Sequence, residues 1–214
     1  MTSNFSGVGK FSNGKIEGIA TIDGGRYEDL NVDGICTIKG DIEARNFDVN
    51  GMMTVEGGIT CDKFDCDGMA TVSGNIKAKE VDVEGMVTIG GTKLEADKIE
   101  CDGIITMDGE ISADKIEADG FIKAREIVGD HIKIKSHRKS FFFTVFTPQK
   151  LKFSSVDLIE ATTIDLRWVK AETVRGHDVK IGEECRIERL DYTGKLSVDP
   201  SATIGTVTGP DQGK

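Results

Sequence analysis

A short repeat of glycine-containing turns runs through the first 120 residues and restricts the fold more than any other feature. Glycines that follow an acidic or amide residue recur at steps of 17, 17, 17, 18 and 17, at Gly34, Gly51, Gly68, Gly85, Gly103 and Gly120. This period is too short for the common helical repeats and is typical of one turn of a parallel β-solenoid. The sequence therefore predicts one coil per repeat.

Apolar residues alternate with polar ones within each repeat, as they do in strands that turn one face inward. After Gly34 the inward positions form three pairs: Cys36 and Ile38, Ile42 and Ala44, Phe47 and Val49. Stacking the repeats predicts apolar columns, of which one is Ile22, Ile38, Val55, Val72, Ile89 and Met107. We therefore expect an all-β, single-stranded parallel β-helix with three sheets, a triangular cross-section and about ten coils, roughly 50 Å long.

One interruption of the repeat sets the predicted domain organisation. Residues 130–152 hold six of the 27 Lys and Arg residues but only one acidic residue. We expect a flexible segment at 1–14, coils at 15–129, a basic aromatic insertion at 130–152, further coils at 153–207 and a disordered tail at 208–214. The alternation resumes at Val156 and Leu158. Both runs of coils are therefore expected to belong to one solenoid.

Charge and cysteine content narrow the expected partners and compartment. The net charge of −10 repels the phosphates of nucleic acids, so we expect no nucleic-acid partner. Five cysteines without a Cys-x-x-Cys pair indicate a reducing compartment and small core residues rather than disulfides. The sequence has no run of about 18 apolar residues and no apolar stretch of the signal-peptide type at its start. We therefore expect a cytoplasmic protein.

Two stretches resemble the bactofilins, the bacterial polymer-forming cytoskeletal proteins. One is the repeated pattern DGxxTIxGxIxA between Gly18 and Gly120, and the other is VKAETVRGHDVKIGEECRIERLDYTGKLSVDPSATIGTV, residues 169–207. The resemblance implies a right-handed β-helix that polymerises end to end without nucleotide, often on the inner membrane, and scaffolds wall-modifying, cell-shape or motility machinery. The chain departs from compact family members in its insertion and in its N-terminus, where only Met1 and Phe5 match their apolar membrane-targeting segment.

The ends of the predicted solenoid are the expected polymer contacts. Terminal strands carry unpaired backbone N–H and C=O groups, which pair with further strands unless something covers them. Neither the first fourteen nor the last nine residues contain an amphipathic helical pattern. We predict a homopolymer with contacts through Ile16 and Ile22 at one end and Val198 and Ile204 at the other. The alternative is that residues 1–14 fold back as a non-helical cap.

Two further features predict contacts with partners. An outward apolar row beside a threonine ladder comprises Ile19, Ile35, Met52, Met69, Met86, Ile104 and Phe121. Such a row is typical of an interaction surface, and lateral filament pairing, a protein client or cover by the insertion all fit it.

The insertion predicts a second contact, with a membrane or a partner. Its candidate residues are Lys133, Lys135, Arg138, Lys139, Phe141, Phe142, Phe143 and Phe146. Basic and aromatic residues together suit an anionic membrane; packing on the solenoid and client docking are the alternatives.

No set of residues points to catalysis, and we expect neither an enzyme nor a cofactor or metal site. A left-handed hexapeptide acyltransferase, with His177 as its general base, is an alternative. Such enzymes keep six-residue steps, whereas the inward positions from Cys36 to Met53 are spaced 6, 5 and 6 residues apart. Polysaccharide-cleaving β-helices need clustered carboxylates and aromatic platforms, and His131 and His137 lack neighbouring metal ligands. The threonine ladder leaves an ice-binding module as the last alternative.

Overall fold

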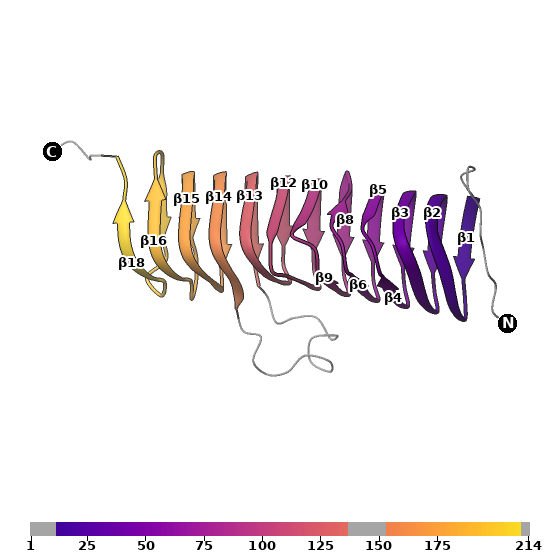
Figure 1. Cartoon of the computed structure of the whole chain (residues 1–214). Helices are drawn as coiled ribbons and strands as arrows, with labels where there is room; N and C mark the ends of the chain where they lie inside the picture. The colour runs from indigo at the N-terminus through magenta and orange to yellow at the C-terminus, as the bar shows by residue number, and fades with distance from the viewer. Residues whose placement is uncertain (1–11, 137–152, 211–214) are drawn as a thin grey trace.

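The computed structural model describes residues 12–136 and 153–210, which form one parallel β-solenoid without a helix. The coils stack along a single axis, with β1 at one end and β18 at the other (Figure 1). The solenoid has about eleven coils, close to the ten expected. The predicted all-β solenoid is thus confirmed, whereas its handedness remains an implication of the resemblance.

Eighteen strands make up the solenoid. The first nine are β1 (Ser12–Ile16), β2 (Ile19–Val32), β3 (Ile35–Val49), β4 (Met52–Val55), β5 (Ile59–Cys66), β6 (Met69–Val72), β7 (Ile76–Lys77), β8 (Glu80–Val83) and β9 (Met86–Ile89). The others are β10 (Lys93–Cys101), β11 (Ile104–Met107), β12 (Glu110–Ala118), β13 (Phe121–Lys135), β14 (Ser154–Arg167), β15 (Val169–Ile181), β16 (Arg186–Tyr192), β17 (Leu196–Val198) and β18 (Thr203–Thr208). A long strand such as β3 follows most of one coil.

The register pairs each inward residue with its equivalent in the next coil. Ile38 pairs with Val55, and Phe47 pairs with Phe64. All four side chains are completely buried. The rings of Phe47 and Phe64 meet edge to face, with centroids 5.7 Å apart. The apolar columns predicted from the alternation are therefore the core of the solenoid.

The repeated glycines are required by the close approach of successive corners. A Cβ at Gly68 would overlap the carbonyl oxygen of Gly51 in the preceding coil, and a Cβ at Gly51 would overlap that of Gly34. The obstructing atoms are backbone, so they cannot move aside as a flexible side chain could. Gly18, which begins the series, has no atom within 4 Å of its Cβ position. Stacking of corners therefore imposes the glycine repeat.

The five cysteines are free, buried thiols, as expected for small core residues: Cys36, Cys61, Cys66, Cys101 and Cys185. Burial raises the pKa of Cys36 to about 11 and those of Cys61 and Cys66 to about 12. The reactive thiolate is therefore scarce at neutral pH. These cysteines serve packing.

The solenoid extends further into the predicted insertion than the sequence indicated. Strand β13 ends at Lys135, so residues 130–135 complete a coil. Ile132 and Ile134 are buried inward positions, whereas Lys133 and Lys135 lie outward and are half-buried. The sequence interpretation gave the charge of the lysines more weight than the alternation of the isoleucines. The alternation correctly places the boundary after residue 135.

Two buried serines close the solenoid where the chain leaves it and returns. Ser154 Oγ accepts a hydrogen bond from Ile122 N at 3.0 Å and lies 2.9 Å from Ser136 Oγ. These bonds satisfy hydroxyl groups that would be costly to bury without partners. The coil is therefore closed between Ser136 and Ser154. Residues 137–152 lie outside the described part of the chain.

Candidate assembly interface

The C-terminal end of the solenoid is an open strand edge. Strand β17 pairs with β15 and strand β18 pairs with β16. Within residues 12–136 and 153–210, neither strand has a partner on its other side. The backbone groups on that side point along the solenoid axis, as they would in a strand that awaits a neighbour.

Inward side chains lie exposed along this edge. Val198 continues the column of the buried Ile181, and Val207 continues that of the buried Leu190. Nevertheless, Val198 is 43% exposed and Val207 is 49% exposed. Ile204 is half-buried. The last coil is thus a core layer that no other described residue covers. Sequence reasoning named Val198 and Ile204 but missed Val207, which the spacing from Leu190 could have identified.

Polar contacts hold the open edge in a defined conformation. Asp199 Oδ1 accepts hydrogen bonds from Ser201 N at 2.9 Å and from Ser201 Oγ at 2.7 Å. These bonds hold the pKa of Asp199 below its usual value. Ser201 Oγ also accepts a hydrogen bond from Glu184 N at 3.1 Å, which ties the corner to the preceding coil. An edge that is already ordered loses less entropy when it docks.

The N-terminal end is built differently. Strand β1 begins at Ser12, within the segment predicted to be flexible, and pairs with Tyr27–Val32 of β2. The half of β2 that begins at Ile19 pairs with β3, its only strand partner among the described residues. Ile16 and Ile22, the predicted contacts, are 9% and 6% exposed. They are core residues of this end, which offers a backbone edge rather than exposed inward side chains.

An outward apolar row, here called the ridge, follows one side of the solenoid. Its members are in register in successive coils: Ile19, Ile35, Met52, Met69, Met86, Ile104 and Phe121. Ile19 is 74% exposed, and the next three are 47%, 48% and 45% exposed. Ile104 and Phe121 are only 7% and 2% exposed. The accessible part of the predicted lateral surface therefore lies in the N-terminal half.

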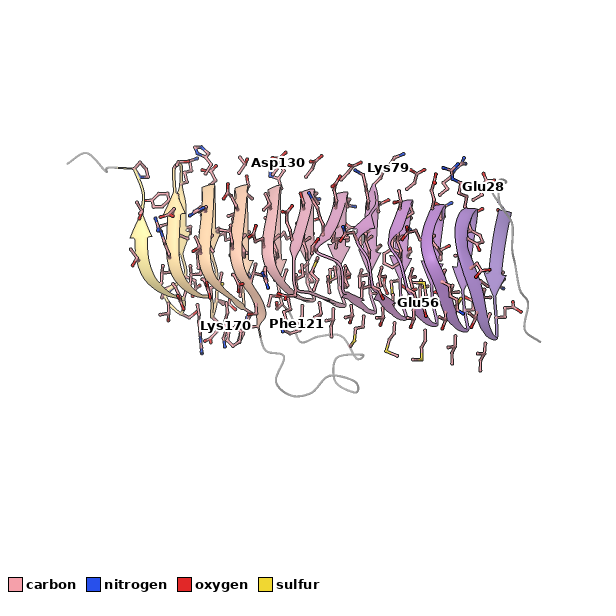
Figure 2. All side chains as sticks on the ribbon, viewed as in Figure 1. Glu28, Glu56, Lys79, Phe121, Asp130 and Lys170 are labelled. Carbon is pink, nitrogen blue, oxygen red and sulfur yellow. The ribbon has the colours of Figure 1, made fainter. Side chains whose placement is uncertain are left out.

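Aromatic residues continue this side beyond the ridge. The rings of Phe153 and Trp168 lie 5.8 Å apart, and Lys170 Nζ and the Arg186 guanidinium lie 4.9 and 5.0 Å from the Phe153 ring centre. Figure 2 shows Lys170 on the same edge as Phe121 and Lys79 on the opposite edge. Sequence reasoning missed this cluster, although the inward position of Val169 implies that Trp168 points outward.

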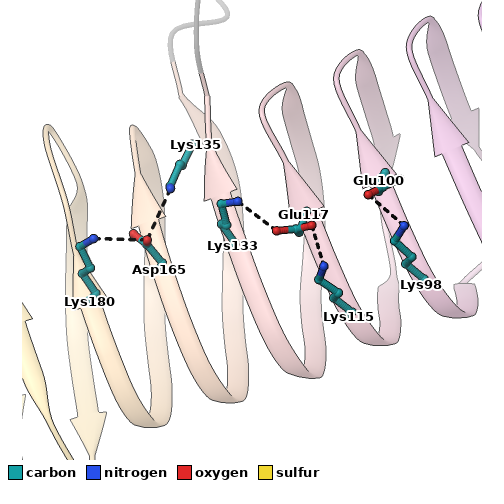
Figure 3. A network of polar contacts seen from close by, with 8 residues as sticks. All are labelled: Lys98, Glu100, Lys115, Glu117, Lys133, Lys135, Asp165 and Lys180. Carbon is teal, nitrogen blue, oxygen red and sulfur yellow. Dashed lines mark hydrogen bonds and ion pairs between the residues drawn. The ribbon is translucent and has the colours of Figure 1, made fainter.

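Charged side chains form a ladder on the outward positions of β10 and β12 to β15 (Figure 3). Glu117 accepts hydrogen bonds from Lys115 and Lys133, at 2.8 and 2.9 Å, which lower its pKa to about 2. Asp165 pairs with Lys135 and Lys180 at 3.6 and 3.5 Å. Lys133 and Lys135, predicted to belong to a membrane or partner loop, thus make ion pairs within the solenoid.

In four earlier coils the same column carries a carboxylate, at Asp48, Asp65, Asp82 and Glu100. Asp48 pairs in register with Asp65, and Asp65 with Asp82. Burial, and then the charge of Asp65, raises the pKa of Asp48 and of Asp82. Among the described residues, no group of three or more histidines, cysteines or carboxylates could hold a metal ion. Neighbouring carboxylates of this column therefore repel one another, and ion pairs of Asp65 with Lys63 and of Glu100 with Lys98 offset part of the repulsion.

The remaining sequence predictions concern the insertion and the enzyme alternative. Arg138, Lys139, Phe141, Phe142, Phe143 and Phe146 lie outside the described residues. His177 lies exposed in an open groove of about 830 Å³, with Nδ1 2.9 Å from Thr193 Oγ1. Its described ring partner is a hydroxyl group rather than a carboxylate. The residues that are described include no helix long and apolar enough to span a membrane.

Comparisons with known proteins give one partial similarity and no family assignment. No protein-family model matches the chain, and no solved structure matches it. The chain is similar to the uncharacterized protein YhbE of Bacillus subtilis (strain 168), with 38% identity over 85 residues. The matched region covers 40% of this chain and 35% of that protein. The chain therefore matches about a third of the length of this relative. The name of the relative states no activity.

Proposed function

We propose that this chain is a structural protein that assembles end to end into filaments without a nucleotide. The observation that carries the proposal is the last coil, where Val198 and Val207 lie exposed at inward positions of an unpaired strand edge. A second copy stacked on this coil would cover both side chains and pair the backbone. The stacking direction continues the axis of the solenoid, so repeated contacts produce a filament.

Backbone hydrogen bonds must supply a large part of the binding free energy of the stacked contact. Complete burial of an exposed valine contributes about 1.5–3 kcal/mol, so the half-exposed Val198 and Val207 contribute about 1 kcal/mol each. Association costs on the order of 4–15 kcal/mol in lost freedom. The two valines do not offset this cost alone. Backbone hydrogen bonds, at about 0.5–1.5 kcal/mol each, are needed along β17 and β18.

The role of such filaments follows from the resemblance to bactofilins in the coil pattern and in residues 169–207. A β-solenoid with an open end fits a polymer-forming structural protein. We extend the proposal to a scaffold for cell-envelope, shape or motility machinery, in the cytoplasm or on the inner face of the cell membrane. Its partners would be further copies of itself together with wall-modifying or motility proteins.

Electron microscopy and sedimentation of the purified protein without nucleotide test the proposal. Val198→Arg places a charge in the stacked contact, where burial without a partner is costly, and should shorten or abolish filaments. Ser197→Arg adds the same charge at the exposed outward position beside it and should leave assembly intact. Unchanged filaments from folded Val198→Arg protein would refute the C-terminal contact. Discrete trimers with acyl-coenzyme-A turnover would instead favour the hexapeptide acyltransferase.

A further inference from the structure

An acidic row borders the exposed part of the ridge. The positions two residues before four successive ridge residues are, in chain order, Asp33, Asn50, Asp67 and Glu84, and all four are exposed. Asp33 lies 3.5 Å from Lys15. Asp67 and Glu84 form no ion pair within the part of the chain that the structure describes, and the charge of Asp67 is the largest cause of the raised pKa of Glu84. Most of the negative charge of this row is therefore not neutralised.

A basic row borders the other side of the ridge, in the later coils. A threonine ladder lies two positions after the ridge and comprises Thr37, Thr54, Thr71, Thr88 and Thr106. It continues in register into Lys123, Ser155, Lys170 and Arg186, all of which are exposed. None of the three cations forms an ion pair with a described carboxylate. The face thus carries opposite charges on its two sides, in different halves of the solenoid.

The two rows match position by position when one is shifted by five rungs. Five successive register pairs lead from Thr71, in the coil of Asp67, to Lys170. The same step brings the other three pairs to one level: Asp33 with Lys123, Asn50 with Ser155 and Glu84 with Arg186. Each carboxylate then meets a cation, and the single amide meets the single hydroxyl group.

Other shifts match the two rows less well. Shifts of four or six rungs give only two pairs of opposite charge. A shift of three rungs leaves Glu84 opposite the uncharged Ser155. Complementarity over all four positions therefore selects the shift of five rungs.

The positions of the rows on either side of the ridge select the orientation. Two copies with parallel axes bring these faces together after a half turn about the axis, which exchanges the two sides of the ridge. The acidic row of one copy then meets the basic row of the other. Antiparallel copies would instead place each row against the continuation of the same row. Charge complementarity therefore requires parallel axes.

We propose that this face binds a second copy of the chain in parallel orientation, displaced by five rungs, or about 24 Å, along the axis. The acidic row of one copy faces the basic row of the other, and Met69 on the ridge faces Trp168. The contact covers exposed apolar side chains such as Ile35 and Met52. A second copy fits this face better than an anionic membrane, because the acidic row repels anionic lipid headgroups.

The displacement is about half the length of a solenoid with about eleven coils. Each copy therefore contacts one neighbour through its acidic row and another through its basic row, and these two neighbours lie in line, ten rungs apart. A contact of this heterologous kind does not close on itself. The lateral contact does not require stacked ends, whereas a ribbon of two half-staggered filaments does and so rests on the proposed function.

Charge reversal tests the lateral contact by sedimentation velocity at low salt, in a Val198→Arg background that removes the proposed end contact. The parent should associate, and Lys170→Glu with Arg186→Glu should weaken its association at least about ten-fold, because like charges then face each other. Asp67→Lys with Glu84→Lys should do the same. A one-to-one mixture of the two variants should recover association, since each reversed row again meets the opposite charge.

A control variant separates this effect from that of net charge. Lys77→Glu with Lys79→Glu makes the same change of charge in an open groove, and Lys79 lies on the opposite edge (Figure 2). This variant should associate like the parent. A parent that stays monomeric would leave the face to another kind of partner. Reversed variants that associate like the parent, or a mixture that does not recover, would assign association to another surface. Each of these results overturns the proposal.

Cross-linking with a short bismaleimide tests the displacement and the orientation in the full chain. Copies with Asp67→Cys, mixed with copies with Lys170→Cys, should give a covalent heterodimer. The native cysteines are buried, so the unmodified chain serves as the blank. Preferential cross-linking of Asp67→Cys to Thr71→Cys would indicate an unstaggered pair, and homodimers of Asp67→Cys would indicate antiparallel copies. Either outcome contradicts the staggered parallel contact.

Discussion

Truncation of one aromatic core residue should reveal how strongly a single column stabilises the solenoid. Phe64 is completely buried and lies in register between Phe47 and Val81. Phe64→Ala leaves a cavity that the flanking coils cannot fill, because backbone hydrogen bonds fix the rung spacing. Such truncations lower the free energy of unfolding by about 3–5 kcal/mol. The lost edge-to-face contact with Phe47 accounts for about 0.5–1.5 kcal/mol of this decrease.

Urea unfolding followed by circular dichroism measures this loss, at a concentration where no filaments sediment, because assembly would add to the apparent stability. The matched control is Met69→Ala, which removes a side chain that is 45% exposed on the ridge. We expect the control to lower the free energy of unfolding by about 1 kcal/mol or less. A loss below about 1 kcal/mol for Phe64→Ala, or one equal to the control, would refute a tightly packed column.

Two further predictions concern corners and charge. Gly68→Ala should lower the unfolding midpoint in urea, because its Cβ would overlap the backbone of Gly51 and Asn50, whereas Gly18→Ala should be neutral or stabilising, because its Cβ position is open; equal midpoints for the two variants would refute the corner argument. Hydrogen bonds from Lys115 and Lys133 depress the pKa of Glu117 from 4.5 to about 2. Its ionised form therefore stabilises the fold above pH 4.5, and this contribution disappears as the pH falls towards 2. The stability difference between the native chain and Glu117→Gln should shrink over that range in chemical denaturation, and a pH-independent difference would contradict the network.

The sequence alone determined the coil architecture, because a 17-residue period and strict alternation leave few solutions for an aliphatic, glycine-rich chain. The columns through Ile38 and Phe47 could be predicted residue by residue, since each coil repeats the last. Alternation also predicted that Val198 and Ile204 would continue inward columns. These features depend only on neighbouring residues or on the repeat period, so they can be predicted from the sequence.

Only the tertiary structure decided where regularity ends and which equivalent positions differ. The burial of Ile104 and exposure of Met69 cannot be distinguished in the repeat, because exposure depends on what lies beside a residue rather than on its place in the coil. Lys133 likewise became part of a ladder only when its coil stacked on Glu117. The open edge at Val207 arises for the same physical reason: an inward side chain becomes core only when another layer covers it.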